Sequence, residues 1–328
     1  MLMFQLPFNF KQQKKPSSFL TIDIGSNEVK VAAFGLGQDG THPTSKVSVL
    51  GITKKQVSHE SMRSGSVINS EAVVQDLKDA IEEVVPEGEV IKDAVFGVSG
   101  ILGTGFMITV KVSRKKVDEI TAKEVQDNFD KIQEEAYVIA QGLFRDMVGQ
   151  EDMDIKMITS SVVYAKLDGV NVEELEGKTG KKLEIAVYTA FTPTYHFNVV
   201  HDISKKLGLN MVALAPTTYA LAKSLSFSKG SDYDGVIIDV GGEMTDVAIV
   251  FSGGIVASRS IEIGGNHFTR VLGKGLSLSP VEAEQRKVSY SFEKLNESEE
   301  MLVRGYMDNL LDTWLNSLDV VFSDFTGV

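Results

Sequence analysis

Residues 235–256 read GVIIDVGGEMTDVAIVFSGGIV, an apolar strand that ends in an aspartate and two glycines before a second apolar strand begins. Residues 19–34 read FLTIDIGSNEVKVAAF and repeat this order. When the two stretches are superposed, Asp23 falls on Asp239, and the glycine two positions later also coincides. A buried strand gains nothing from a carboxylate at its end, because burying a charge is unfavourable. The repetition therefore indicates a functional device that the chain contains twice.

The residues of this device suit a phosphate and a metal ion. A glycine-rich turn exposes backbone N–H groups, and its small residues let a phosphate approach them closely. A carboxylate at a strand end can hold Mg²⁺ directly or through water. One strand that ends in Asp-x-Gly is weak support, because such ends are common. Two in matching contexts predict a clamp that holds a nucleotide's phosphates and metal between two domains.

Length and composition limit the class of protein. The 328 residues are enough for two domains, and 43% hydrophobic with 24% charged residues is a globular composition. The net charge of −12 argues against a general nucleic-acid binder, which needs a basic face. The absence of cysteine excludes disulfides and thiolate metal sites. No apolar run approaches the ~18 residues that span a bilayer.

The pattern along the chain predicts an α/β protein that is interrupted once. Two strands around a turn at Gly25-Ser26-Asn27 and a third strand precede a helix that Asn69 caps, and a fourth strand follows. Residues 101–176 then predict an insert of strands and one long helix, where Thr121 and Glu124 have capping-box spacing. The α/β pattern resumes with a strand over 181–191 and a helix near 194–207. After LNMVALAP (209–216), the sequence predicts a short helix over 217–225, three antiparallel strands over 235–265 and helices from His267 onward.

A third element lies near the second turn in the sequence. Gly264-Gly265 closes a strand and leads into a predicted helix. Glu284 and Lys287 stand three apart, on one helical face. This pair has two interpretations, a solvated ion pair on the surface or a pair that grips a ribose and an adenine.

Three motifs carry a family resemblance. IDIGSNEVKVAAF (22–34) resembles the first phosphate motif of the actin-like ATPase superfamily, and VIIDVGGEMTDVAIV (236–250) resembles the second. IEIGGNHFT (261–269) resembles the nucleoside-contacting part. Within the superfamily, SMRSGSVINSEAVVQDLKDAIEEV (61–84) and the position of the insert resemble the FtsA family of bacterial cell division. The pilus-assembly relative PilM has a similar plan and remains an alternative.

The resemblance implies an α/β, actin-like ATPase fold with two ribonuclease-H-like halves, a nucleotide cleft and an FtsA-type inserted small subdomain. The expected parts are a tail (1–17), the first half (18–100 and 177–207), the insert (101–176) and a second half with a partial small subdomain (208–328), which we expect to be truncated. Asp23 and Asp239 are the expected Mg²⁺ ligands. The expected nucleotide-binding residues are Asp23, Gly25, Ser26, Asn27, Asp239, Gly241, Gly242, Thr245, Gly264, Gly265, Glu284 and Lys287.

The function that the resemblance implies is an ATP-binding cytoskeletal scaffold that polymerises and links a division ring to the membrane. Its cofactors are ATP and Mg²⁺, and its partners are further copies of itself and a tubulin-like division protein or an inner-membrane assembly protein. It is expected in the cytoplasm, peripheral to the inner face of the cell membrane. The alternatives are a PilM-like scaffold of pilus or type II secretion assembly and a small-molecule kinase, for which the sequence offers no identifiable catalytic base.

Two positions depart from the family pattern and predict at most slow ATP hydrolysis. Glu243 stands where the family usually has a third glycine, and a carboxylate there repels a terminal phosphate unless Mg²⁺ offsets it. Ala215 precedes Pro216, where hydrolysing members often carry a glutamate that polarises water. A group for that task is therefore missing from the expected place.

The first sixteen residues, MLMFQLPFNFKQQKKP, form an unusual segment. Its apolar residues precede its lysines, which is the reverse of a signal peptide. Aromatic side chains beside lysines suit an anionic membrane surface. The segment is therefore interpreted either as a disordered leader or a tail packed on its own domain, or as a short arm that contacts the membrane or a partner.

Overall fold

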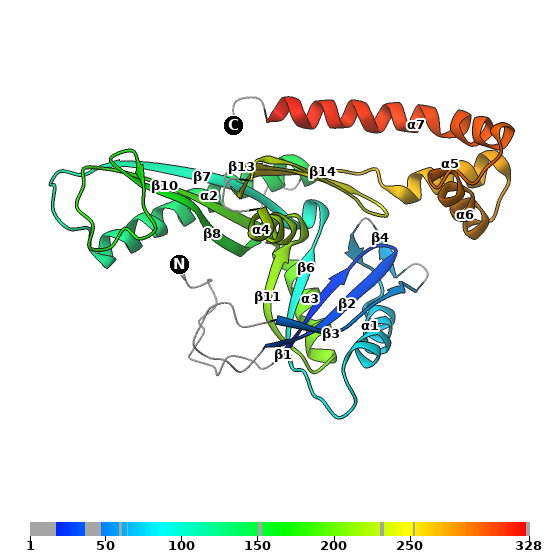
Figure 1. Ribbon diagram of the computed structural model, residues 1–328, viewed down its shortest axis with the longest axis horizontal. Helices are drawn as coiled ribbons and strands as arrows, with labels where there is room; N and C mark the ends of the chain where they lie inside the picture. The colour runs from blue at the N-terminus through cyan, green and yellow to red at the C-terminus, as the bar shows by residue number, and fades with distance from the viewer. Residues whose placement is uncertain are drawn as a thin grey trace.

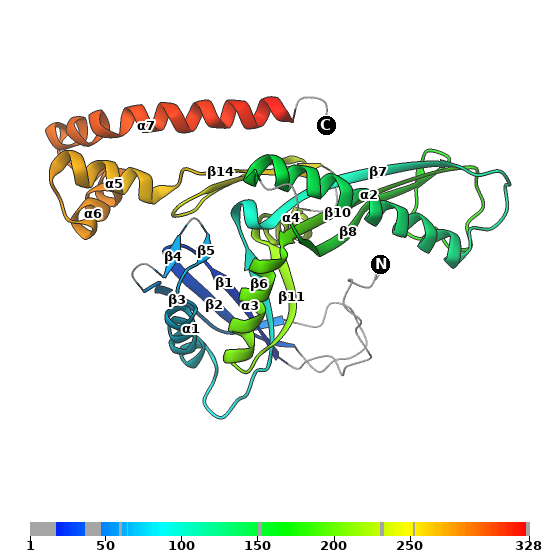
Figure 2. The same cartoon turned by 180° about the vertical axis from the view of Figure 1, so that it is seen from behind.

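The structure is a computed structural model, and it describes residues 18–36, 47–58, 61–63, 65–149, 153–229, 233–251 and 253–325. Two large sheets organise these residues, one of five strands in the order β11-β6-β1-β2-β3 and one of seven in the order β12-β13-β14-β7-β10-β8-β9. A two-stranded ribbon, β4 (Met62–Arg63) with β5 (Ser66–Val67), accompanies them. The five-stranded sheet lies below the end of the longer one that contains β14, away from the insert, in Figures 1 and 2.

The five-stranded sheet has a ribonuclease-H-like order. Strands β1 (Ser18–Ile24), β2 (Glu28–Leu36) and β3 (Val47–Gln56) are antiparallel, and β6 (Asp93–Val98) and β11 (Asn210–Pro216) extend the sheet in parallel with β1. Alternate side chains of β1 and β2 are fully buried, as period-2 patterning requires. Helices α1 (Ser70–Val84) and α3 (Thr194–Lys206) contact each other and pack on this sheet. The expected cap is confirmed, because the Asn69 side chain accepts a hydrogen bond from the backbone N–H of Ala72.

The insert forms the left end of the molecule in Figure 1. A short 3-10 turn, η1 (Gly100–Gly103), leads into β7 (Thr104–Ser113), and α2 (Ala122–Val148), β8 (Ile155–Leu167), β9 (Val170–Asn171) and β10 (Lys182–Pro193) follow. Helix α2 covers one face of these strands through a buried apolar row that includes Phe129, Ile132, Ala136, Ala140 and Phe144. The long helix and the strands expected of the insert are therefore present.

The strand pairing differs from the expected division of the chain. We expected residues 177–207 in the first half, but β10 is paired along its length with β7 and β8 of the insert. We expected the second half to begin at 208, but β11 pairs with β6 and completes the first sheet. The insert is not a separate sheet either, since Phe106 of β7 pairs with Ala257 of β14. The sheet to which each strand belongs is decided by hydrogen bonds to strands that are distant in the sequence. The local sequence pattern does not indicate these partners.

The remaining elements build the second half. Strands β12 (Gly235–Val240), β13 (Thr245–Phe251) and β14 (Gly254–Ile261) are antiparallel, as expected, and α4 (Thr217–Lys229) packs on them. Helices α5 (Gly265–Leu276) and α6 (Pro280–Ser291) lie at the end opposite the insert, and α7 (Glu297–Asp324) runs back above the seven-stranded sheet (Figure 1). Its last turns pack on β13 and β14 through Leu318, Val321 and Phe325.

The expected capping box at the start of α2 forms only in part. Thr121 accepts a hydrogen bond from the backbone N–H of Glu124, as a cap should. The Glu124 carboxylate instead binds the buried guanidinium of Arg114 at 2.6 and 2.9 Å. Arg114 also donates to the backbone carbonyls of Asp118 and Gly180 at 2.8 and 2.7 Å. One cation therefore joins the end of β7, the start of α2 and the loop before β10.

Within the described ranges, no helix combines the length and apolarity needed to cross a membrane. Residues 1–16, for which a membrane or partner contact was one interpretation, lie outside the described residues.

Candidate functional site

The two repeated stretches fold into matching hairpins. In the first, the Gly25 N–H donates to the Glu28 carbonyl at 3.1 Å. In the second, the Gly241 N–H donates to the Met244 carbonyl at 2.8 Å. Each hairpin therefore carries its aspartate at the end of the incoming strand and closes its turn with the same hydrogen bond, so the duplication seen in the sequence is also a duplication of structure.

The carboxylates of the two hairpins, Asp23 and Asp239, are close enough for their charges to repel each other. Burial raises the pKa of the Asp23 carboxyl, the Lys30 ammonium at 3.4 Å opposes that rise, and repulsion from Asp239 adds to it. A third carboxylate, Asp246, is buried close by, and its pKa is raised first by burial and further by Asp239 and Asp23. Hydrogen bonds from Ser260 and Gly100 at 2.6 and 2.8 Å oppose the rise at Asp246.

This arrangement fits a bound cation. Three carboxylates repel one another here, and Lys30, whose side chain is mostly exposed, is the cation bonded to Asp23. Among the described residues, no group of three or more Asp, Glu, His or Cys side chains has the geometry to hold a metal by itself. Mg²⁺ commonly keeps several waters and uses one or two carboxylates together with phosphates. Asp23 and Asp239 suit that kind of site.

The two turns touch directly through small residues. A Cβ atom on Gly242 would lie 2.9 Å from the Asn27 side chain. A Cβ atom on Gly264 would lie 2.6 Å from the carbonyl oxygens of Gly241 and Gly242. Glycine is needed at these positions because a Cβ atom would collide with neighbouring atoms, and not because the backbone conformation requires it. In the part of the chain that the structure describes, the backbone N–H groups of Ser26 and Asn27 have no protein acceptor.

Gly264 and Gly265, expected at the nucleoside, fasten α5 to the second turn. The N–H groups of Gly265 and Asn266 donate to the carbonyls of Gly241 and Gly242 at 2.9 and 2.8 Å. These donors at the start of α5 are satisfied by protein, so they are not free to bind an anion in this conformation. The helix and the second turn form one unit.

Glu284 and Lys287 lie next to this unit and are partly buried, with 44% and 20% of their side chains exposed. The Lys287 ammonium donates to the Gly265 carbonyl at 3.0 Å and to the Thr269 hydroxyl at 2.9 Å, and it pairs with Glu284 at 2.8 Å. Glu284 in turn accepts from the Thr269 hydroxyl. The pair holds α6 against the first turn of α5, beside the residues expected at the nucleoside.

Thr245, expected in the second phosphate loop, lies in the core beneath it. Its side chain is fully buried. The hydroxyl donates to the Ile263 carbonyl at 2.7 Å and accepts from the indole N–H of Trp314 at 3.0 Å. Thr245 therefore supports the hairpin from within in this conformation, and its polar atoms are occupied by protein groups.

The site contains partners that the sequence did not indicate. The Arg270 guanidinium bonds both oxygens of the Glu243 carboxylate, at 2.9 and 3.2 Å. Asn266 donates to the same carboxylate at 2.8 Å and exchanges hydrogen bonds with Asn27. Burial works against ionisation of Glu243, but the bonds from Arg270 and Asn266 outweigh it and lower its pKa. The charge expected to repel a phosphate is therefore offset by Arg270.

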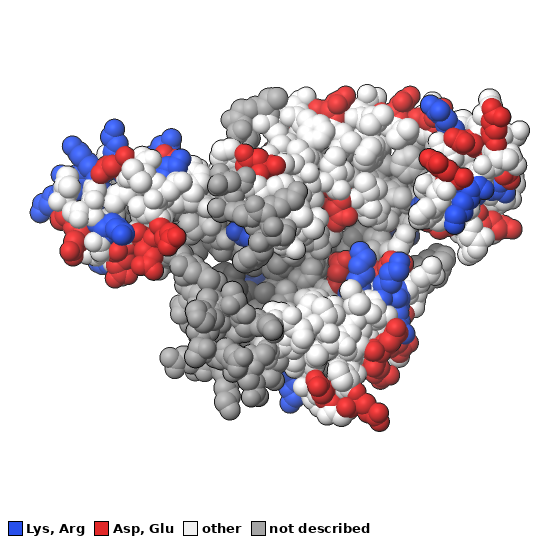
Figure 3. All heavy atoms as spheres, viewed as in Figure 1, with Lys and Arg blue, Asp and Glu red and all other residues white. Residues whose placement is uncertain are grey.

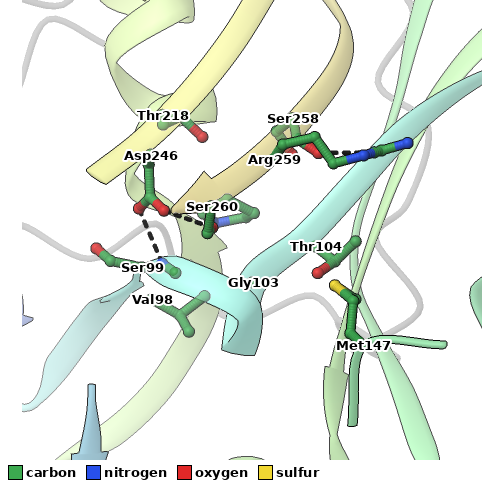
Figure 4. A pocket seen from close by; sticks show the side chains of 12 residues that line it. Val98, Ser99, Gly103, Thr104, Met147, Thr218, Asp246, Ser258, Arg259 and Ser260 are labelled. Atoms are coloured by element: carbon green, nitrogen blue, oxygen red, sulfur yellow. Dashed lines mark hydrogen bonds between the residues drawn. The ribbon is translucent and has the colours of Figure 1, made fainter. Parts of the chain in front are cut away.

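A small pocket lies behind the turns, where Asp246 points toward η1 (Figure 4). Its wall includes residues of both halves and of the insert, since Ser99 follows β6, Thr218 lies in the first turn of α4, and Met147 lies in the last turn of α2. The Ser99 and Thr217 hydroxyls share a hydrogen bond of 2.9 Å at this junction. Asp246 thus ties η1 to β14 where the two sheets meet.

The ribonuclease-H-like order of the first sheet, together with the duplicated hairpin, identifies the architecture. The chain has the actin-like ATPase fold. A solved structure titled "PilM-PilN type IV pilus biogenesis complex" contains a chain that superposes on 94% of this chain and 77% of its own, with a TM-score of 0.64 and 14% identity. This likeness concerns the fold alone.

Sequence comparison gives a more specific resemblance. The family model described as cell division protein FtsA matches residues 236–309. Cell division protein FtsA of Bacillus subtilis (strain 168) is 23% identical over 277 residues, which are 82% of this chain and 57% of that protein. FtsA of Neisseria meningitidis serogroup B (strain MC58) is 26% identical over 285 residues, or 85% of this chain and 62% of that protein. This actin-like protein therefore resembles FtsA, and it spans about three fifths of the length of these relatives.

Proposed function

We propose that the chain is an ATP-binding, actin-like scaffold of bacterial cell division that polymerises and links a division ring to the membrane. The observation that carries the proposal is the pair of hairpins whose aspartates, Asp23 and Asp239, interact across the junction of the two halves. The resemblance to FtsA over more than four fifths of the chain supports the division role. Fold alone would not support it, since one fold hosts many functions.

ATP would bind between the two turns, with its phosphates against the glycines of both hairpins and the N–H groups of Ser26 and Asn27. Mg²⁺, when bound, neutralises the phosphates and the carboxylates that face them. Asp23 and Asp239 would hold it, directly or through water. Gly264, Gly265, Glu284 and Lys287, which keep α5 and α6 beside the second turn, place the nucleoside.

ATP acts mainly as a conformational ligand that biases the two halves toward one arrangement, and its hydrolysis is slow at most. Ala215 offers only a methyl group where a water-polarising side chain would be needed. Glu243 is bound to Arg270 and is not free to act on water. Phosphate release far below the usual enzyme range of ~1–10³ per second is expected.

The partners are further copies of the chain and a tubulin-like division protein. The insert, which lies at the end of the molecule opposite α5 and α6, is the docking part. Figure 3 shows Lys and Arg mainly along the upper and left edge of that end and Asp and Glu mainly along its lower edge, and this presence of both charges suits contact between copies rather than with nucleic acid. Residues 1–16 contribute a contact to the inner face of the membrane, on the strength of their sequence.

The deciding experiment measures nucleotide binding by calorimetry. Asp23→Ala and Asp239→Ala should each abolish Mg²⁺-dependent ATP binding, whereas Asp202→Ala, an exposed aspartate on α3, should leave it unchanged. Unchanged affinity in both site variants would place the nucleotide elsewhere. Filament formation with ATP, and co-sedimentation with a purified tubulin-like division protein, then test the scaffold role.

The membrane contact has a separate test. The full chain and a version that starts at Ser17 are sedimented with vesicles that contain or lack anionic lipid. The full chain should sediment more with anionic vesicles, and the gain should be larger under polymerising conditions, because many arms bind by avidity. Equal sedimentation of the two versions would reject the arm as a membrane contact.

A further inference from the structure

Two asparagines form a reciprocal amide pair across the junction of the halves. The Asn27 Nδ2 donates to the Asn266 Oδ1 at 2.8 Å, and the Asn266 Nδ2 donates to the Asn27 Oδ1 at 2.6 Å. Asn27 belongs to the first turn, whereas Asn266 belongs to the start of α5. The two carboxamides therefore exchange both of their bonds although the residues lie far apart in the sequence.

The pair lies where the first turn contacts the second. The Asn27 carboxamide rests on Gly242, because a Cβ atom placed on that glycine would be 2.9 Å from its Cγ and Oδ1. The backbone of Asn266 is bonded to the same glycine through its N–H, at 2.8 Å from the carbonyl oxygen. Both members of the pair thus contact the second turn at Gly242.

The orientation of Asn266 is fixed by a further contact. Its Nδ2 also donates to the Glu243 carboxylate at 2.8 Å, and that carboxylate is held by two bonds from Arg270. Asn266 is therefore preset by its own half of the molecule to receive Asn27, whereas Asn27 itself is exposed. Such an arrangement can open by movement of Asn27 without disturbing α5.

We propose that the Asn27–Asn266 pair is a latch between the halves that distinguishes a nucleoside triphosphate from a diphosphate. The proposal rests on the proposed nucleotide site between the turns. A third phosphate reaches further between the turns than a second one does, toward Gly242 and the pair that contacts it. A triphosphate therefore opens the latch and takes the freed amide donors, and a diphosphate leaves it closed.

The chain has no cysteine, so a double variant can report the latch without background labelling. Asn27→Cys with Asn266→Cys places one thiol on each side. A direct disulfide needs Cβ atoms about 3.5–4.5 Å apart, and two side-chain amides normally separate these two Cβ atoms. A short bifunctional methanethiosulfonate reagent is therefore used to link the two thiols. Gln126→Cys with Asp130→Cys, an exposed pair one turn apart on α2 whose native side chains are 2.7 Å apart, controls for reagent chemistry.

Cross-linking of the latch variant should proceed without nucleotide and with ADP, and a non-hydrolysable ATP analogue should slow it about tenfold. The control pair should react equally in all three conditions. Once cross-linked, the variant should still bind ADP but bind the ATP analogue about tenfold more weakly, and reduction of the link should restore the affinity.

Equal cross-linking with ADP and the ATP analogue, in a chain that calorimetry shows to bind both, would overturn the latch and leave the proposed function standing. Absence of nucleotide binding in the wild-type chain would overturn both. If the unlinked variant binds neither nucleotide, the wild-type chain decides by NMR. Its Asn27 and Asn266 side-chain amide signals, identified by their loss in Asn27→Ala and Asn266→Ala, must shift with the ATP analogue and stay in place with ADP.

Discussion

Arg270 on α5 grips Glu243 of the second turn with both terminal nitrogens, at 2.9 and 3.2 Å. The carboxylate is only 18% exposed, whereas the arginine side chain is 51% exposed. The pair lets a glutamate occupy a position that would otherwise repel a phosphate, because the opposite charge comes from the same half of the molecule. Nothing in the sequence indicates that Arg270 and Glu243 pair.

The first prediction tests this compensation. Arg270→Ala leaves the Glu243 charge unpaired beside the proposed phosphate site, so ATP affinity measured by calorimetry should fall about fivefold, as suits a pair that is partly exposed to water. Adding Glu243→Gln removes the uncompensated charge and should bring the affinity back to within about twofold of wild type. A double variant as weak as Arg270→Ala alone would show that Arg270 contacts the nucleotide itself.

The second prediction concerns stability without nucleotide. Burial and the Asp239 charge raise the pKa of Asp23, which means that its ionised form is disfavoured in the folded state. Asp23→Asn should therefore raise the free energy of unfolding at neutral pH by about 1 kcal/mol while it abolishes ATP binding. Urea denaturation of both proteins without nucleotide or Mg²⁺ measures the difference. A loss of stability would mean that the Lys30 pair outweighs burial.

The third prediction concerns the insert. Arg114 is almost fully buried and bonds Glu124, Asp118 and two further backbone carbonyls around the base of α2. Arg114→Ala leaves Glu124 without its partner and several carbonyls without donors, so unfolding should become easier by about 3–5 kcal/mol. Lys131→Ala, on the exposed face of α2, serves as the control and should change stability little. Urea denaturation checks both variants, and a small effect of Arg114→Ala would contradict a structural role.

Local features of the fold were predictable from sequence because their causes are local. Asn69 caps α1 through a bond to Ala72, three residues away. The hairpin at Gly25 forms where glycine and short polar residues interrupt two apolar strands. The same reasoning placed the second hairpin and most of the helices.

Features that depend on distant partners were not predictable. β10 and β11 follow each other in the chain, yet they belong to different sheets, because their partners are β7 and β8 in one case and β6 in the other. The Asn27–Asn266 pair and the Glu243–Arg270 pair likewise join residues that only the tertiary fold brings together. Thr245 was expected in the phosphate loop because it follows the glycine turn in the sequence. Its hydroxyl instead donates to the Ile263 carbonyl and accepts a hydrogen bond from the Trp314 indole.

The pairing of β10 also changes how the docking role of the insert should be tested. Deleting residues 101–176 would remove both strands that flank β10 and expose its fully buried side chains. Such a deletion would damage the fold whatever the insert does. Substitutions at exposed residues of its outer end, such as Lys115→Glu with Lys116→Glu, are the better probe of filament formation, with ATP binding as the check on folding.

The last prediction is a pH dependence with a defined sign. His196 lies in the first turn of α3 and is 6% exposed, and burial lowers its pKa from 6.5 to about 4. The imidazole is thus neutral in the folded chain over a range where the unfolded chain takes up a proton. Because the unfolded state binds more protons between pH 6.5 and about 4, the folded state loses stability as the pH falls through that range. Between pH 7 and pH 5 the loss from this residue should approach about 2 kcal/mol, since each pH unit contributes about 1.4 kcal/mol.

His196→Gln cannot titrate, so its free energy of unfolding should fall less over the same interval. His201→Gln, one turn further along α3, is the matched control and should keep the wild-type dependence. Urea denaturation at both pH values measures all three proteins, and an equal loss in wild type and His196→Gln would show that other groups carry the acid sensitivity.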